Sequence, residues 1–307
     1  MTAEITELPV PERGRNIAMI VITILPFAGL IAAVTLLWNK AVGPSDLGLF
    51  AGMYVLCGFG ITIGFHRMLT HHAFEAIAPL KAGLLIFGSL AIQGPAIDWA
   101  VDHRTHHAFS DKQGDPHSPH HGYSSSVWGR LQGLAHAHVG WMFGHNRTER
   151  ERYAKDLLGD RLVVTISNLF PLWVVLSFAI PFALGGIITG SWKGAVTGLV
   201  WGGLVRLFFN HHITWSVNSI CHVFGRRPFA AADQSTNNWV LALPSLGEAW
   251  HHNHHVFPTS AFHGLGWRQI DLSGLTIAVW EKLHLVRNVR RPTAEQIGRK
   301  RATAAGV

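Results

Sequence analysis

Long uncharged stretches alternate with polar, histidine-containing stretches along this chain. Residues 17–38, 47–65 and 162–192 carry no charged side chain, and residues 194–205 open a fourth apolar stretch. A helix needs about 20 apolar residues to cross a bilayer. The first three stretches reach that length, and the fourth reaches it if its helix includes Arg206. The pattern predicts an all-α integral membrane protein with spans at residues 17–38, 47–65, 162–190 and 194–215.

A fifth apolar segment, residues 82–97, is shorter and is interrupted by Gln93, Gly94 and Pro95. Segments of this length are more often buried, re-entrant or interfacial than spanning. If this one crossed the membrane, the histidines near residue 66 and those near residue 103 would lie on opposite faces. A re-entrant or interfacial segment keeps them on one face, together with a third cluster that follows the fourth span. We therefore predict four spans and one re-entrant or interfacial segment.

The charge distribution predicts the orientation. The formal net charge of +7 would by itself allow nucleic-acid binding. The cations, however, gather in residues 13–15, 147–161, 226–227 and 287–301, and the other connections are nearly free of them. This positive-inside pattern places both termini and the 98–161 loop in the cytoplasm, with membrane lipid and no nucleic acid as partner. We expect a cytosolic segment over residues 1–16, one domain over 17–290 and a basic, disordered tail over 291–307.

Three histidine clusters supply the candidate chemistry. They occupy residues 66–72, 103–107 and 251–255, and the chain has 21 histidines in 307 residues. Neutral imidazole is the commonest nitrogen ligand for transition metals. Because residues three and four apart share a helix face, each HxxHH run can direct its imidazoles to one point. Core packing would require a separate hydrogen-bond partner for each buried ring, so the clusters indicate a site for more than one metal.

The fourth apolar stretch predicts a further candidate ligand. No proline occurs from Gly194 to Phe224, so one continuous helix of roughly 45 Å is predicted there. Its last turns should project beyond the ~30 Å hydrocarbon layer. Asn218 and His222 are four residues apart and share a face of that projecting end. His222 is therefore a candidate ligand, and Asn218 is either a polar residue at a helix end or part of the metal site.

Four segments resemble the histidine boxes of membrane fatty acyl desaturases, and the resemblance is closest to the stearoyl-CoA (Δ9 acyl-CoA) desaturase type. The segments are Gly64–His71, Trp99–Ser110, Thr214–Ser219 and Gly247–Pro258. The resemblance spans residues 45–285 and implies four transmembrane helices with a cytosolic helical cap that holds a di-metal site. It implies two iron ions held by His66, His71, His103, His106, His107, His222, His251, His254 and His255, with Asn218 approaching the metal through water.

The implied reaction removes two hydrogens from adjacent methylenes of a saturated acyl chain, using O2 and two electrons. The substrate would be a long-chain saturated acyl-CoA or acyl-lipid. The chain has no His-Pro-Gly-Gly haem motif and no flavin or dinucleotide fingerprint, so the resemblance implies an external electron donor, either a ferredoxin-like carrier or a reductase. His72 and His252 fall where the family has other residues, and we do not expect them to be ligands.

The residues around the boxes supply further candidates. The boxes are nearly free of carboxylates, whereas soluble di-iron proteins use Glu and Glu-x-x-His sets on a bundle, so the few carboxylates are expected to orient imidazoles instead of binding metal. The candidates are Asp102, Asp111, Asp115 and Glu248. Loop hydrogen bonds or contacts with the ligand histidines are expected for six further histidines, namely His117, His120, His121, His136, His138 and His145.

Two sets of residues are candidates for substrate binding. Arg147 and Arg150 precede the third span and could bind the phosphates of coenzyme A, although the positive-inside excess also accounts for them. Steps of four from His66 lead back through Thr62 and Gly58 to Tyr54 and Phe50, all on one helix face. The two bulky residues are predicted to close an acyl tunnel, with packing against neighbouring helices or lipid as the alternative.

Two other functions compete with desaturation. A fatty acid hydroxylase or conjugase could use the same scaffold, because such boxes serve several C–H oxidations. A membrane metal-binding or metal-transport protein is the non-enzyme alternative. It is disfavoured because transporters hold their ligands near the bilayer midplane, whereas these clusters lie beyond helix ends.

Overall fold

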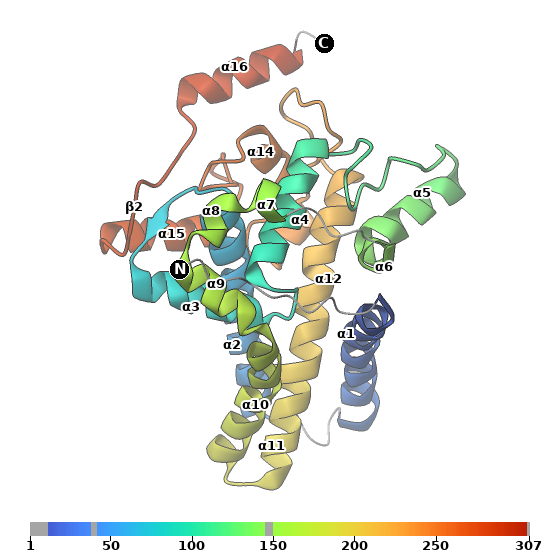
Figure 1. Cartoon of the computed structure of the whole chain (residues 1–307), viewed down its shortest axis with the longest axis vertical. Helices are drawn as coiled ribbons and strands as arrows, with labels where there is room; N and C mark the ends of the chain where they lie inside the picture. The colour runs from blue at the N-terminus through green and yellow to red at the C-terminus, as the bar shows by residue number, and fades with distance from the viewer. Residues whose placement is uncertain (1–11, 38–41, 145–149, 306–307) are drawn as a thin grey trace.

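The computed structural model describes residues 12–37, 42–144 and 150–305, and most of them are helical (Figure 1). Helices up to the second box are α1 (Glu12–Ala32), η1 (Ala33–Leu37), α2 (Pro44–Phe59), η2 (Gly60–Thr70), α3 (Ala78–Leu90) and α4 (Ala96–Phe109). The central helices are α5 (Val127–Ala135), η3 (His136–Gly140), α6 (Trp141–Gly144), α7 (Arg150–Tyr153), α8 (Lys155–Leu158), α9 (Arg161–Asn168) and α10 (Phe170–Thr189).

The remaining helices are α11 (Trp192–Gly198), η4 (Leu199–Val205), α12 (Arg206–Ser219), η5 (Ile220–His222), α13 (Trp239–Ala242), α14 (His251–Val256), α15 (Leu272–Lys282) and α16 (Ala294–Ala305). The segments η1 to η4 are π-helical, and η5 is a 3₁₀ turn. Strand β1 (Glu75–Ala76) pairs antiparallel with β2 (Val286–Arg287).

Two helices among the described residues are long and apolar enough to cross a membrane. They are Pro44–Thr70, which joins α2 and η2, and Phe170–Thr189, which is α10. Shorter apolar helices cover Met19–Thr35 and Ala78–Leu90. The long helix predicted from residue 194 runs without a break from Trp192 to His222. Two spans are thus supported by length and composition, and the four-span topology stays a prediction.

Three predicted boundaries differ from the structure. Residues 162–190 form two helices that meet at Leu169, because Pro171 has no N–H and its ring clashes with the carbonyl four residues earlier. The segment 82–97 is not one element, since α3 ends at Leu90 and α4 begins at Ala96. The second predicted span does not end at residue 65, because its helix continues to Thr70.

The basic tail, predicted to be disordered, forms helix α16 over Ala294–Ala305. A capping box starts it: the Thr293 hydroxyl accepts from the Gln296 backbone N–H, and the Gln296 side chain accepts from the Thr293 N–H. This reciprocal pair satisfies two of the N–H groups that a helix start leaves unpaired. Local capping therefore outweighs the repulsion among the basic side chains.

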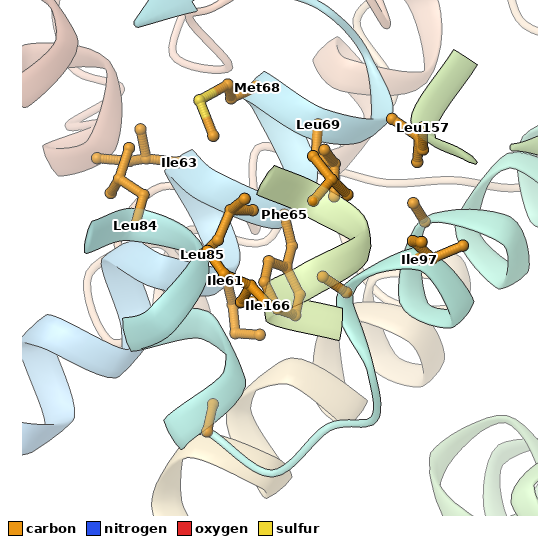
Figure 2. Close-up of a cluster of buried hydrophobic side chains, with 14 of the residues drawn as sticks. Ile61, Ile63, Phe65, Met68, Leu69, Leu84, Leu85, Ile97, Leu157 and Ile166 are labelled. Carbon is orange, nitrogen blue, oxygen red and sulfur yellow. The ribbon is translucent and has the colours of Figure 1, made fainter. Parts of the chain in front are cut away.

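The main hydrophobic core holds η2 against α3, α4 and α9 (Figure 2). Ile63 and Phe65 of η2 meet Leu84 and Leu85 of α3, and all four side chains are buried. The backbones of η2 and α3 touch at Gly60, where an added Cβ would lie 2.0 Å from the Gly88 nitrogen. Close packing of this kind leaves little freedom of rotation, so the histidine-bearing end of η2 is fixed relative to α4.

The hairpin of α10 and α11 forms one end of the molecule, and α14 and α16 lie toward the other (Figure 1). Arg206 of α12 joins the long helix to its neighbours. Its guanidinium is fully buried and donates to the backbone carbonyls of Leu90 at 3.0 Å and Ser177 at 3.1 Å. A buried charge of this kind persists only when its donors are satisfied, so Arg206 fixes α12 against α3 and α10.

Candidate metal centre

Four elements bring the nine predicted histidines to one place. Helix α4 carries His103, His106 and His107, and the one-and-a-half-turn helix α14 carries His251, His254 and His255. Each HxxHH run is helical as predicted, so its three rings share one face. The segment η2 and the residue that ends it supply His66 and His71, and η5 supplies His222.

The π-helical form of η2 explains the five-residue spacing of His66 and His71. The His71 N–H donates to the His66 carbonyl at 3.2 Å, which is the i→i+5 bond of a π-helix. The two ring centroids lie 4.9 Å apart. In an α-helix, residues three and four apart face each other instead, so the wider turn is what aligns this pair.

The histidines form two groups. The five-histidine group comprises His66, His71, His103, His107 and His254, whose candidate ligand atoms all lie within 4.8 Å of one another. Within it, the Nε2 atoms of His66 and His254 are 3.0 Å apart and those of His254 and His107 are 2.9 Å apart. The buried Nε2 of His71 has no hydrogen-bond partner among the residues that the structure describes.

The four-histidine group comprises His106, His222, His251 and His255, again with ligand atoms within 4.8 Å of one another. The Nε2 atom of His251 lies 3.0 Å from that of His222 and 3.0 Å from that of His255. Asn218 lines the cavities described below. A water-mediated role for Asn218 stays a prediction.

Carboxylates fix the tautomer of four of these rings. His106 Nδ1 donates to Asp115 at 2.9 Å, His222 Nδ1 to Asp111 at 3.0 Å and His255 Nδ1 to Asp233 at 3.1 Å. His66 Nδ1 makes a short contact with Glu248. A neutral ring protonated at Nδ1 presents a lone pair at Nε2. The Nε2 atoms therefore face one another as acceptors, and such lone pairs repel unless a cation lies between them.

The spacing also fits a metal. With metal–nitrogen distances of about 2.1 Å, ligands at right angles to each other lie about 3.0 Å apart. The neighbouring Nε2 atoms of both groups lie 2.9–3.4 Å apart. Both groups are therefore compatible with a bound transition metal, each with its donors already turned inward.

Burial keeps most of the rings in the form that binds metal. Burial, reinforced by the charge of neighbouring imidazoles, holds the pKa values of His103, His107 and His254 well below the usual range. The pKa values of His71, His251 and His255 are lowered well below it for the same reasons. At His222 burial acts in the same direction, but the hydrogen bond to Asp111 raises the pKa overall. Neutral imidazole is the ligating form.

Three of the four predicted carboxylates contact ligand histidines, and one carboxylate was missed. Asp111, Asp115 and Glu248 each bind a ring as described, and Asp102 lines the larger cavity below. Asp233, which orients His255, was not predicted because no box or spacing marks it within the loop before α13. Its only signal is an acidic residue between the apolar residues 228–232 and the polar residues 234–238.

A buried ionic network supports Glu248. Arg67 is fully buried and donates to Glu248 at 2.9 Å and to Asp271 at 2.9 Å. His263 was also missed by the sequence analysis; it is fully buried, its ring centroid lies 4.5 Å from that of His254, and its Nδ1 lies 3.6 Å from Glu248. Removing one partner from such a network leaves uncompensated buried charge.

The histidines excluded as ligands, or assigned to loops, lie mostly outside the two groups. His72 pairs with Asp156, and His252 contacts the Phe229 backbone and Ser235. His120 binds the His222 carbonyl, and His138 binds Ser219 and His212. His117 stacks on His106 with centroids 4.2 Å apart, and His136 packs near Tyr123. The His121 backbone N–H binds Ser118, and His145 lies outside the described residues.

Two cavities lie beside the centre. The larger, of 450 Å³, is lined by residues of α1, α4, α6, α7 and α12, including Arg150. The smaller, of 50 Å³, is bordered by His66, His103 and His251 and reaches Tyr54. Gln93, Trp99 and Thr214 line both. There the Gln93 amide donates to Thr214 at 2.9 Å and accepts from the Trp99 indole at 3.2 Å.

The predicted substrate residues are placed differently by the structure. Tyr54 lines the smaller cavity with Gly58 and Thr62, as the shared helix face predicts. Phe50 is not among the residues that line it, and instead stacks on Tyr54 with ring centroids 5.9 Å apart. Arg150 lines the larger cavity and pairs closely with Asp98. Arg147 lies outside the described residues.

Comparison with known proteins gives a consistent picture. Residues 42–267 match the model of the fatty acid desaturase family. The chain is 43% identical over 279 residues to a hex-5-enoyl-[acyl-carrier protein] acetylenase of Moorena producens, covering 91% of this chain and 87% of that protein. It is 36% identical to an sn-1 stearoyl-lipid 9-desaturase of Anabaena variabilis, covering 79% and 83%. It is 32% identical to an acyl-CoA C20 Δ5-desaturase of Anemone leveillei, covering 94% and 89%.

Proposed function

The chain belongs to the fatty acid desaturase family, and from this premise we propose that it introduces a cis double bond into a saturated acyl chain at a histidine-ligated centre of two iron ions. Family membership makes it an oxidoreductase that acts on fatty acyl chains, and its two candidate spans support association with the membrane. The metal-transport alternative has no support from these relatives.

One observation carries the proposal: the smaller cavity is bordered by histidines of both groups. His66 and His103 belong to the five-histidine group and His251 to the four-histidine group. The rest of the lining is mainly apolar, with Ile61, Val217 and Leu246 among it. A methylene chain that entered this cavity would pass both groups, so two adjacent carbons could lie next to the histidines that would hold the iron.

We propose that the histidine groups hold the iron and that the cavity residues hold and orient the chain. The reaction is R–CH2–CH2–R′ + O2 + 2 e⁻ + 2 H⁺ → R–CH=CH–R′ + 2 H2O. Iron supplies the reductive activation of O2 when it is bound. The hydrogen-bonded trio of Gln93, Thr214 and Trp99 narrows the path where the cavities meet, and Tyr54 closes its end. These contacts select one pair of methylenes by position, since an apolar wall offers no other distinction.

The proposed position of the double bond is Δ9, and the proposed carrier is acyl-CoA. The 9-desaturases among the relatives support the position. The relatives act on acyl-CoA, on acyl-lipid or on acyl-carrier protein, so acyl-lipid is the alternative carrier. Arg150 lines the larger cavity, where a phosphate group of coenzyme A would be within reach of its guanidinium.

Expression in a desaturase-deficient host, followed by mass spectrometry of the fatty acids, tests this function. The expected product is a monounsaturated chain with its double bond at carbon 9. Separating acyl-CoA from lipid fractions after a short pulse of labelled stearate identifies the carrier, since label appears as alkene first in the pool that is the substrate. A hydroxylated product with no alkene would replace the proposal with the hydroxylase alternative.

A second candidate reaction is the conversion of an alkene to an alkyne. The 43% identity to an acetylenase favours it. The same host fed with a monounsaturated chain tests it: an alkyne product would extend the activity, whereas an unchanged alkene would limit it to saturated chains.

A further inference from the structure

We infer that a basic groove on the face of the molecule that carries α14 and α16 is the docking site for a small acidic one-electron carrier protein. This inference rests on the proposed function. Each double bond requires two electrons beyond the two that the substrate gives, and a one-electron carrier must therefore dock, transfer and leave twice for each product. A surface for such a carrier needs complementary charge, nearness to the centre and rapid release.

The groove, of 600 Å³, supplies the charge. Residues 256–260 line it together with four cations, Arg290, Arg291, Arg299 and Lys300. None of the described residues that line it is acidic. Arg291 is held by Glu281 and by the ring of Phe262, 4.6 Å away. Arg290 and Lys300 are exposed at the rim. An acidic surface would be attracted to this rim at a rate that falls as salt rises.

The floor of the groove is connected to the candidate metal centre. Val256 ends helix α14 and is the next residue after His255 of the four-histidine group. Phe257 packs edge-on against Phe229 with ring centroids 5.5 Å apart, and Phe229 stacks on His252 at 6.0 Å. His252 adjoins His251 in the same helix. The groove is therefore connected to the ligand-bearing helix α14 in two ways: through the backbone from Val256 to His255, and through the packed rings of Phe257, Phe229 and His252.

The composition of the groove suits a short-lived complex. Val256, Phe257 and Pro258 are apolar and half-buried, whereas the four cations that line the groove are exposed. Interfaces with an apolar core and a charged rim gain encounter rate from the rim and limited affinity from the small core. A carrier that must leave after each electron needs this combination.

The position of the groove favours a soluble partner over lipid headgroups. The chain after α14 and helix α16 both line the groove. Helices α14 and α16 lie toward the end of the molecule away from the hairpin of α10 and α11 (Figure 1). Helix α10 is a candidate membrane span. The basic rim therefore faces away from the part of the protein that would enter the bilayer.

The test uses the full-length protein in lipid nanodiscs and an acidic [2Fe–2S] ferredoxin as the probe. The groove variant R290E/K300E is compared with R287E/K282E, which makes the same change of charge at exposed residues that do not line the groove. We expect the groove variant to bind ferredoxin at least about fivefold more weakly at low salt, with a smaller salt dependence, because rim charges govern encounter. The control should stay within about twofold of wild type by the same principle.

Binding is measured on iron-loaded and on iron-stripped protein, and the two should agree because the groove lies outside the centre. The rate at which reduced ferredoxin is oxidised should fall in the groove variant, whereas turnover driven by dithionite should equal that of wild type. Equal loss of binding in both variants, or no loss in either, overturns the inference. A third outcome would also overturn the inference: anionic lipid binds the wild type but not R290E/K300E, while both bind ferredoxin equally. The groove would then be a site for lipid headgroups.

The same data separate this inference from the proposed function. If dithionite drives alkene formation but R290E/K300E binds ferredoxin as well as wild type does, the function stands and the docking site is wrong. If ferredoxin binds the groove and is oxidised but no alkene forms, the docking site stands and the desaturase function is wrong.

Discussion

The nine candidate ligands depend on a small set of carboxylates at the residue scale. Asp111, Asp115, Asp233 and Glu248 each hold the Nδ1 proton of one ring. This turns Nε2 toward the centre and makes it more basic. The carboxylates therefore define which ring atom can bind metal, although none of the four belongs to either histidine group.

Substituting Asp233 with asparagine should weaken metal binding at the four-histidine group by about 10–100-fold, the usual effect of losing such a partner. The asparagine can still meet His255 Nδ1 but carries no charge to stabilise its proton. Competition with a chelator measures the affinity. Asp156→Asn is the matched control, because Asp156 pairs with His72 and Arg104, which both lie outside the two groups. Equal affinity in D233N and D156N would contradict the role of Asp233.

Replacing His107 or His254 with alanine should abolish the alkene product while the protein stays in the membrane. Both rings belong to the five-histidine group, and their Nε2 atoms lie 2.9 Å apart. His72→Ala is the control, since His72 is exposed and outside both groups. Product analysis and membrane fractionation check the result, and wild-type product from either variant would remove that residue from the centre.

The HxxHH spacing predicts six of the nine candidate ligands at this scale, because residues three and four apart share a helix face, and the resemblance to the desaturase boxes implies the full set. The sequence does not predict Asp233 or His263, because each reaches the centre only through the fold of a loop. The role of Arg67 could not be predicted either, because its contacts with Glu248 and Asp271 depend on the tertiary fold.

Helices with local irregularities position the chemistry at the element scale. The π-helical turn of η2 brings His71 beneath His66, and a pattern based on 3.6 residues per turn cannot anticipate it. The break at Leu169 could be predicted from Pro171. Thr293 and Gln296 have the spacing of a capping box, which predicts a helix start. The basic composition of the tail favoured disorder instead, and the helix was not predicted.

Tyr54 at the end of the smaller cavity predicts a limit on chain length. Tyr54→Ala should shift the products of a mixed pool toward longer substrates, because the alanine opens space beyond the present floor. The shift should be modest, since one methylene in an apolar pocket is worth about 1–3 kcal/mol. Phe50→Ala should shift the profile less, because Phe50 does not line the cavity. An unchanged profile in a well-expressed Y54A variant would exclude Tyr54 as the floor.

At the scale of the whole molecule, the fold gathers many neutral imidazoles in one buried place. Six of the nine candidate ligands have pKa values lowered well below the usual range, first by burial. The pKa values are lowered because the fold brings α4, α14, η2 and η5 together around the histidines. From the sequence, the predicted membrane topology is what places the three histidine clusters on one side. The four-span arrangement behind that prediction is still to be tested.

The metal-stripped protein should lose stability as the pH falls from 7.5 to 5.5. A histidine in the unfolded chain has a pKa of about 6.5, whereas these six histidines stay neutral in the folded protein. Below that pH the unfolded state binds more protons, so stability present above it is lost progressively. His222 acts in the opposite direction because Asp111 raises its pKa, but it is one group against six.

Thermal unfolding followed by circular dichroism checks this pH dependence. Bound metal competes with protons for the same nitrogens, so the loss of stability in the loaded protein should move to lower pH. An unchanged or rising Tm of the stripped protein between pH 7.5 and 5.5 would show that the rings are not buried as neutral groups.

The most direct test of the account is a single turnover of purified, iron-loaded protein in nanodiscs. The protein is reduced with dithionite without O2, mixed with a saturated acyl substrate and exposed once to O2, and alkene and iron are then counted. The account predicts two irons and one double bond for each chain that turns over, and in the H254A variant at most one iron, at the four-histidine group, and no double bond. Protein that holds two irons, binds the substrate and still forms no alkene would contradict it.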